Sequence, residues 1–407
     1  MLWDVFCRVI DNFGDIGVCW RLSADLAARG QHVRLWVDDA AALNWMAPEV
    51  TWSLDETGRE VGAGHPGITV HRWAHAECAE LVPEPGDVVV EAFGCDPPEP
   101  FLARMNRPSP PAWINLEYLS AQAYVERSHG LQSPVFSGPA AGLRKHFFYP
   151  GFTPRTGGLL READLADRQR AFTEEARLAW LRHLGVPATS DCRLVSVFCY
   201  ATAPLGEWLG AMAEEALSHA SATRVLLTPG HATRLAQAWL TTASSAHQKA
   251  LILHELPALP QPEFDKLLWA CHLNIVRGED SAVRALWAGK PHIWHIYPQD
   301  DGVHADKLAA FLDHWLQDTG GPLSSALRAA WQHFNRLPTG PSESDEVATG
   351  SALLCGESSP PPPLPDWRQA DSDWARASRA ARQRAWSQTD LVTQLQAFAA
   401  PFVTSSG

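Results

Sequence analysis

Short apolar runs rich in Val, Ile and aromatic residues alternate, along the first half of the chain, with a longer segment in which apolar residues recur every three or four positions. The longer segment, residues 15–30, predicts a helix that ends at Gly30. The short runs predict strands at residues 2–9, 32–39, 68–73, 87–93 and 112–118. Strands that alternate with helices are typical of βαβ units on a parallel sheet.

A second series of the same kind begins near residue 193. Its strands are predicted at 193–200, 223–230, 251–259, 273–278 and 291–297, and its helices at 206–219, 232–243, 263–271 and 279–289. The sequence therefore predicts an α/β protein with two doubly wound, Rossmann-like domains. We place them at 1–160 and 187–365, with a helical connector at 161–186, a proline-rich insert near 340–365, and a C-terminal helix within 366–407 that braces the first domain.

Composition narrows the class of protein. With 407 residues, 46% of them hydrophobic, the chain can bury two cores. A formal net charge of −13 argues against a general binder of nucleic acid or anionic membranes and suits a basic partner. We expect a cytoplasmic protein, because the start lacks a secretory signal, no apolar run is long enough to span a membrane, and the eight cysteines form no CxxC pair.

Two doubly wound domains bind ligands where the carboxyl ends of their strands face a cleft, so we expect the residues of the site in the turns after the strands. The first turn, RVIDNFGDIG at 8–17, places Asp11 and Asp15 between a strand and a helix. Its two glycines do not make the GxGxxG fingerprint, which disfavours a nicotinamide cofactor. From the local pattern alone, Asp15 is either a catalytic acid or a structural one, namely a helix N-cap or a first-turn acid that stabilises the helix dipole. Asp11 is equally compatible with an Asx turn.

The second informative turn is VRGEDSAVRALWAGKP at 276–291. It turns at Gly278 and starts a helix with Glu279, Asp280 and Ser281, so backbone amides at the helix start, together with Arg277, would receive phosphates. The alternative is that Asp280 or Ser281 merely caps the helix. Farther along, the adjacent Asp300 and Asp301 are interpreted as loop acids or caps rather than metal ligands.

Four segments resemble one family: VIDNFGDIGVCWRL, INLEYLSAQAYVE, FFYPGFTPRTGGLLRE and NIVRGEDSAVRALWAGKPHIWHIYPQ. They are similar to the EarP family, bacterial protein-arginine rhamnosyltransferases that modify elongation factor P. The similarity spans nearly the whole chain except the proline-rich insert. It implies a GT-B glycosyltransferase fold and transfer of L-rhamnose from dTDP-β-L-rhamnose to an arginine nitrogen of elongation factor P, with inversion and without a metal or other cofactor.

The resemblance also implies roles for individual residues. Asp15 would be the catalytic carboxylate, with Asp11 and Asn12 supporting it and Glu279 acting as a second acid. Phe13 and Gly14 would lie with the substrates, and Asp280 and Ser281 would bind diphosphate. The dTDP pocket would be shaped by Phe198, Tyr200, Gln261, Phe264, Arg277, Tyr297 and Gln299. Cys19 and the alanines at 201 and 203 depart from the polar residues expected there, which bears on the thymine pocket.

The chemistry of arginine fits these residue types. A guanidinium is protonated at physiological pH and is a poor nucleophile, so an enzyme that glycosylates it must orient it and remove a proton. A carboxylate can do both. Two other classes remain open: a GT-B enzyme with a lipid or carbohydrate acceptor, and a non-catalytic nucleotide-sugar-binding protein that has no need of Asp15.

Overall fold

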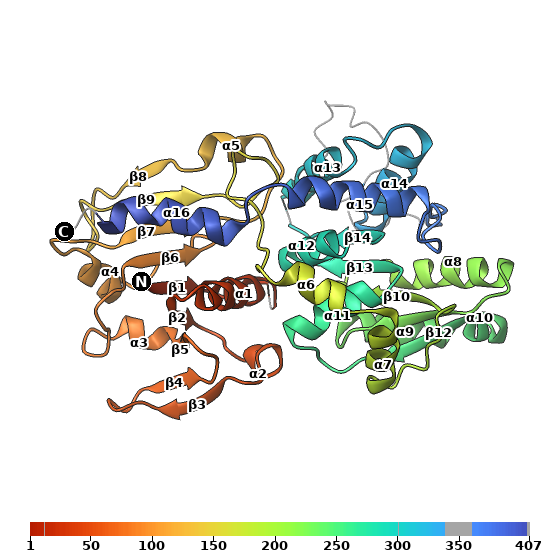
Figure 1. The fold of residues 1–407 in the computed structure, drawn as a ribbon, viewed down its shortest axis with the longest axis horizontal. Coiled ribbons are helices and arrows are strands. Elements are labelled where there is room, and N and C mark those ends of the chain that lie inside the picture. Colours follow the sequence, from red (N-terminus) through yellow and green to blue (C-terminus); the bar gives the residue numbers. More distant parts are fainter. Residues whose placement is uncertain (12, 300, 338–359, 405–407) are drawn as a thin grey trace.

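The computed structural model describes residues 1–11, 13–299, 301–337 and 360–404. Within these ranges two α/β domains lie side by side (Figure 1). The first contains a sheet of nine strands in the order β3-β4-β5-β2-β1-β6-β7-β9-β8. The strands are β1 (Leu2–Cys7), β2 (His32–Val37), β3 (Thr51–Leu54), β4 (Glu60–Ala63), β5 (Ile68–Arg72), β6 (Val88–Ala92), β7 (Ala112–Leu116), β8 (Gln132–Pro134) and β9 (Arg144–Phe148). Six neighbouring strands of this sheet, β5, β2, β1, β6, β7 and β9, are parallel. At the two edges of the sheet, β3, β4 and β8 pair antiparallel to their neighbours.

The second domain holds an all-parallel sheet in the order β12-β11-β10-β13-β14. Its strands are β10 (Arg193–Val197), β11 (Thr223–Leu227), β12 (Leu251–Glu255), β13 (Leu273–Arg277) and β14 (His292–His295). The strand order reverses beside the first strand of each domain, so both sheets are doubly wound. The predicted fold class is confirmed. The ten strands expected from the apolar runs are all present, and β3, β4, β8 and β9 were missed.

Helices cover the faces of both sheets (Figure 1). In the first domain they are α1 (Gly14–Ala28), α2 (Leu43–Met46), α3 (Trp73–Glu77), α4 (Glu99–Met105) and α5 (Tyr124–Ser128). The connecting segment holds α6 (Leu165–Ala171) and α7 (Glu174–His183). The second domain has α8 (Leu205–Ser218), α9 (His231–Leu240), α10 (Ser245–Ala250), α11 (Gln261–Ala270), α12 (Glu279–Ala288), α13 (Val303–Trp315) and α14 (Gly321–Phe334).

The C-terminal region differs from the expected single helix. It contains two helices, α15 (Asp373–Trp386) and α16 (Leu391–Thr404). Figure 1 shows α15 over the second domain and α16 crossing to the first. The chain breaks between them because Asp390 accepts a hydrogen bond from the Thr393 amide at 2.9 Å and so starts a new helix. Trp374 lies in the core of the second domain and Leu395 in that of the first. Most of the proline-rich insert, residues 338–359, lies outside the described residues.

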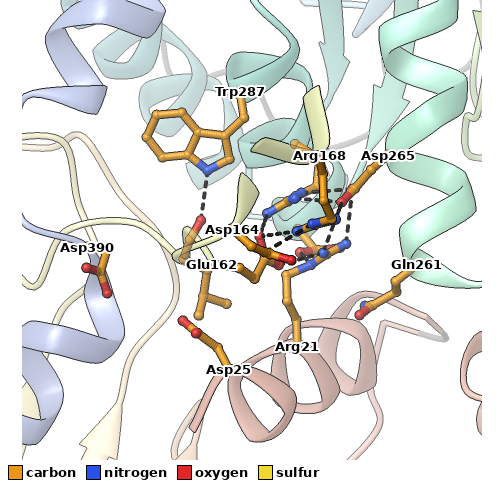
Figure 2. A network of polar contacts seen from close by, with 12 residues as sticks. Arg21, Asp25, Glu162, Asp164, Arg168, Gln261, Asp265, Trp287 and Asp390 are labelled. Carbon is orange, nitrogen blue, oxygen red and sulfur yellow. Dashed lines mark hydrogen bonds and ion pairs between the residues drawn. The ribbon is translucent and has the colours of Figure 1, made fainter. Parts of the chain in front are cut away.

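A buried ionic network joins α1 of the first domain to the connector and to the second domain (Figure 2). Its members are Arg21, Glu162, Arg168, Asp265, Asp280 and Arg284, which we call the interdomain ionic network. Arg21 of α1 bonds Asp280 of α12 at 2.8 Å and Glu162 of the connector at 2.9 Å. Nearby, the Gln261 side-chain amide donates to the Gly17 carbonyl at 2.7 Å. These contacts hold the β1–α1 turn opposite the β13–α12 turn.

Candidate active site

The β1–α1 turn presents Asp15 from the first turn of α1. One carboxylate oxygen accepts hydrogen bonds from the backbone amides of Ile10 and Asp11, at 2.8 and 2.9 Å. The other oxygen receives the Tyr118 hydroxyl at 3.4 Å. The side chain is buried, at 3% exposure, and the N-cap position belongs to Phe13, not to Asp15. Asp15 is therefore a first-turn acid, and the backbone amides of its own turn hold one carboxylate oxygen while the Tyr118 hydroxyl contacts the other.

Asp11 lies between the two domains. Its Oδ2 accepts a 2.7 Å hydrogen bond from the hydroxyl of Tyr200, which follows β10. A Cβ atom at Gly14 would stand 2.5 Å from the same oxygen, so the turn needs glycine there. Burial raises the pKa of Asp11, and the Tyr200 hydrogen bond and the charge of Arg277 oppose that rise. Asn12, the other residue expected to support Asp15, lies outside the described residues.

The β13–α12 turn supplies the opposite side of the site. Gly278 caps α12 with φ of 69°, a left-handed conformation that suits glycine, and no side chain of the described residues caps this helix. The capping alternative for Asp280 and Ser281 is therefore wrong. The guanidinium of Arg277 packs on the rings of Phe198 and Tyr200, 4.5 and 4.6 Å from their centroids. Within the described parts of the chain Arg277 has no ion pair, so its charge is free for an anion.

A first cavity of about 240 Å³ lies between the two turns. Its walls are mostly apolar, as is usual for a site that takes a flat ring. Phe198 and Phe264 meet edge to face on one wall, with centroids 5.8 Å apart. Of the residues expected around the donor, the cavity is lined by Phe13, Gly14, Phe198, Gln261, Phe264, Arg277, Asp280 and Ser281.

A second cavity of about 180 Å³ adjoins the first. The two cavities share Asp11, Gly14 and Gly278 in their linings, so they meet where the turns of the two domains approach each other. The second cavity contains the remaining expected acids, Asp15 and Glu279. Tyr297 and Gln299, which were expected to shape the dTDP pocket, line this second cavity instead. Tyr200 lines neither cavity, but its hydroxyl donates to Asp11 and its ring packs against the Arg277 guanidinium.

Glu279 spans the gap between the domains. One carboxylate oxygen accepts the backbone amide of Leu119 from the first domain at 2.7 Å. The other forms an ion pair with Lys307 of α13. Burial raises the pKa of Glu279, and the ammonium group of Lys307 opposes that rise. Both oxygens of this acid therefore already have partners within the chain.

Two expected ligand-binding side chains are also engaged internally. Both Asp280 oxygens bond the Arg21 guanidinium, at 2.8 and 3.3 Å, and the Gln261 side-chain nitrogen bonds Gly17. Ser281 has no such partner among the described residues and opens onto the first cavity. In this turn, Arg277, Ser281 and the backbone amides at the start of α12 are thus the groups that can receive an anion.

Sequence reasoning missed several residues of the site. Trp45 and Met46 come from the short helix α2 and line the first cavity, and Lys307 lines the second. Their segments carry no turn or helix-start signal that would place them at the strand ends. Asp301 is a loop acid that accepts a hydrogen bond from the Val303 amide at 3.2 Å, whereas the N-cap residue of α13 is Gly302. Asp300 lies outside the described residues. No cluster of three metal-ligating side chains occurs in the described ranges. No helix in those ranges is both long and apolar enough to cross a membrane.

Two doubly wound domains whose strand ends face a shared cavity make up the GT-B fold of glycosyltransferases, and this chain has that fold. More narrowly, the chain belongs to the EarP family: the family model for the elongation factor P (EF-P) rhamnosyltransferase EarP matches residues 3–400.

Individual relatives agree with this family. The protein-arginine rhamnosyltransferase of Pseudomonas putida is 40% identical over 404 residues, and the match covers 97% of this chain and 98% of the relative. That of Pseudomonas aeruginosa is 40% identical over 389 residues, and the match covers 92% of this chain and 94% of the relative. A solved structure that describes EarP-mediated arginine glycosylation of translation elongation factor EF-P is 29% identical, has a TM-score of 0.58 and covers 98% of this chain and 99% of its own.

Proposed function

We propose that this protein is a cytoplasmic protein-arginine rhamnosyltransferase. It transfers L-rhamnose from dTDP-β-L-rhamnose to one side-chain nitrogen of an arginine on elongation factor P, with inversion and without a metal ion. The observation that carries the proposal is the meeting of the two cavities at Gly14 and Gly278. One cavity offers aromatic walls and a free cation for a nucleoside diphosphate, and the other offers carboxylates for a guanidinium. Family membership supports the choice of sugar and acceptor.

On the acceptor side, the carboxylates of Asp15 and Asp11 receive the protonated guanidinium. The Asp15 oxygen that faces Tyr118 orients the planar group and accepts its proton as the new bond forms between nitrogen and the sugar C1. The bond from C1 to the diphosphate oxygen breaks at the same time, and dTDP leaves. Attack from the face opposite the leaving group inverts the configuration at C1.

On the donor side, the leaving diphosphate gains negative charge that must be stabilised. Arg277, the Ser281 hydroxyl and the positive end of α12 supply that stabilisation. Phe198, Phe264 and Phe13 provide the walls for the thymine ring. Because Arg277 already supplies a fixed cation, activity is expected to survive excess EDTA, and a loss that magnesium or manganese restores would contradict the metal-free mechanism.

The test is mass spectrometry of elongation factor P after incubation with this protein and dTDP-rhamnose. A gain of one deoxyhexose on one arginine is the expected result. Transfer only to a lipid or carbohydrate acceptor would identify a different GT-B enzyme. Binding of dTDP without transfer to any of these acceptors would identify a nucleotide-sugar-binding protein.

A further inference from the structure

Lys307 is the cation of the second cavity. It projects from α13, and its ammonium group pairs with Glu279. The same nitrogen lies 5.5 Å from the centroid of the Tyr118 ring, which is close enough for a cation–π contact. Both members of the ion pair are largely withdrawn from solvent, each with a side chain 17% exposed. Lys307 thus touches an acid and an aromatic ring that come from different domains.

These contacts continue to Asp15. Glu279 accepts the amide of Leu119, the residue after Tyr118, at 2.7 Å. The Tyr118 ring stacks on Phe93, with centroids 4.2 Å apart, and its hydroxyl reaches Asp15 at 3.4 Å. A path of direct contacts therefore leads from Lys307 through Glu279 and the segment 118–119 to the acid that faces the acceptor.

We infer that Lys307 is a positioning residue: by pairing with Glu279 it holds the Tyr118–Leu119 segment of the first domain, and with it the hydroxyl that orients Asp15. The inference rests on the proposed function. A Glu279 carboxylate without its cation would be buried and unpaired, a state that favours protonation. Protonated Glu279 is a weaker acceptor for the Leu119 amide, so the segment that carries Tyr118 would loosen. The donor cavity, which Lys307 does not line, would keep its shape.

The experiment compares the full-length protein with Lys307→Met, Glu279→Gln and the double variant, using rhamnosyl transfer to elongation factor P and calorimetric binding of dTDP. We expect Lys307→Met to lower kcat on the order of 10- to 100-fold, the cost of a small misplacement at a reacting centre, with dTDP affinity unchanged. Because Lys307 acts through Glu279, the double variant is expected to be no slower than Glu279→Gln alone. Additive losses, or an unchanged kcat in Lys307→Met, would overturn the inference.

A pH profile separates positioning from simple stabilisation. Lys307 opposes the rise in the pKa of Glu279, so its removal should move the acid limb of the kcat profile to higher pH, and Lys307→Arg should restore both the limb and the rate. A merely structural ion pair would lower the melting temperature and leave the limb in place. Should Lys307→Met fail to fold, Lys307→Gln, which keeps a hydrogen-bond donor, is measured instead against the same expectations.

Lys266→Met is the matched control. Lys266 pairs with Glu263 at 2.7 Å on α11, and neither residue lines either cavity. Its transfer rate and pH profile should equal those of the unmodified protein. If the unmodified protein itself transfers no rhamnose, the proposed function fails, whereas an active protein with an unaffected Lys307→Met variant refutes only the role of Lys307.

Discussion

Helices α1 and α12 each contribute charged side chains to two clusters, and the two clusters are organised differently. In the interdomain ionic network three guanidinium groups meet three carboxylates, and each charge has a partner (Figure 2). In the two cavities Arg277 has no ion pair among the described residues, and Asp15 is held by backbone amides and a hydroxyl. The charges of the network are thus neutralised by the chain, whereas Arg277 and Asp15 face the cavities without an ion pair among the described residues.

The pKa values of two acids, Glu162 of the network and Asp11 of the cavities, shift in opposite directions. Burial would raise the pKa of Glu162, but the guanidinium groups of Arg284, Arg21 and Arg168 hold it well below its usual range. Burial also raises the pKa of Asp11. The hydrogen bond from Tyr200 and the charge of Arg277 lower that pKa by less than burial raises it, so the net shift is upward. A carboxylate with a raised pKa gains more from a cationic ligand than one already paired. Asp11 is therefore suited to receive a guanidinium, and Glu162 is not.

Replacing Asp15 with Asn is the strongest test of the charges that face the cavities without an ion pair. Asn keeps the size of the side chain but removes its charge and basicity, so transfer should fall roughly 10²- to 10⁴-fold, the usual loss of a general base. Melting temperature and dTDP affinity should hold. The matched control is Asp25→Asn on the same helix, where the carboxylate pairs with Arg29 at 3.0 Å. That variant should lose stability and keep transfer, and near-normal transfer in Asp15→Asn would refute its catalytic role.

Arg284→Met tests whether the interdomain ionic network stabilises the fold. Arg284 is 1% exposed and bonds Asp265 at 2.6 Å and Glu162 at 2.9 Å, so its loss leaves two buried carboxylates with fewer cations. Removing one partner of a buried ion pair costs about 3–5 kcal/mol of unfolding free energy. Denaturant unfolding should show a drop of that size. Arg168→Met, at a side chain 29% exposed in the same network, should cost clearly less. Equal stability of Arg284→Met and the unmodified protein would mean that the network does not hold the fold.

Arg277→Gln examines the free cation of the donor cavity. Charge-assisted hydrogen bonds contribute about 1.5–3 kcal/mol, so dTDP affinity should weaken roughly 10- to 100-fold. Stability should change little, because Arg277 packs on rings and forms no ion pair within the described ranges. Arg193→Gln, at the start of β10 and thus at the far end of the sheet, is the control, and calorimetry should show its dTDP affinity unaltered. Unchanged affinity in Arg277→Gln would assign the diphosphate to other groups.

The strands of the second sheet were predictable because apolar residues dominate them, as in β11 with the sequence TRVLL, and all of them except β12 are mostly buried. The edge strands β3 and β8 were not, because their side chains are mostly exposed and carry no apolar run. The turns after β1 and β13 were found because their acids and glycines follow apolar strands directly. Lys307 and the Arg21–Asp280 pair were missed, since the latter joins residues 259 positions apart and only the packed domains bring them together.

The smallest expected effect comes from Tyr200→Phe, which removes a hydrogen bond and no charge. The Tyr200 hydroxyl donates to Asp11 at 2.7 Å and lowers the Asp11 pKa against the larger effect of burial. Without it the pKa rises further, so Asp11 becomes ionised only at higher pH. The acid limb of the kcat/KM profile should therefore move to higher pH, while the plateau falls roughly fivefold, the equivalent of about 1 kcal/mol. Tyr149→Phe, outside both cavities, is the control. A limb that stays in place, or moves to lower pH, would mean that Asp11 does not need to be ionised for transfer, and Asp15 alone would then receive the guanidinium.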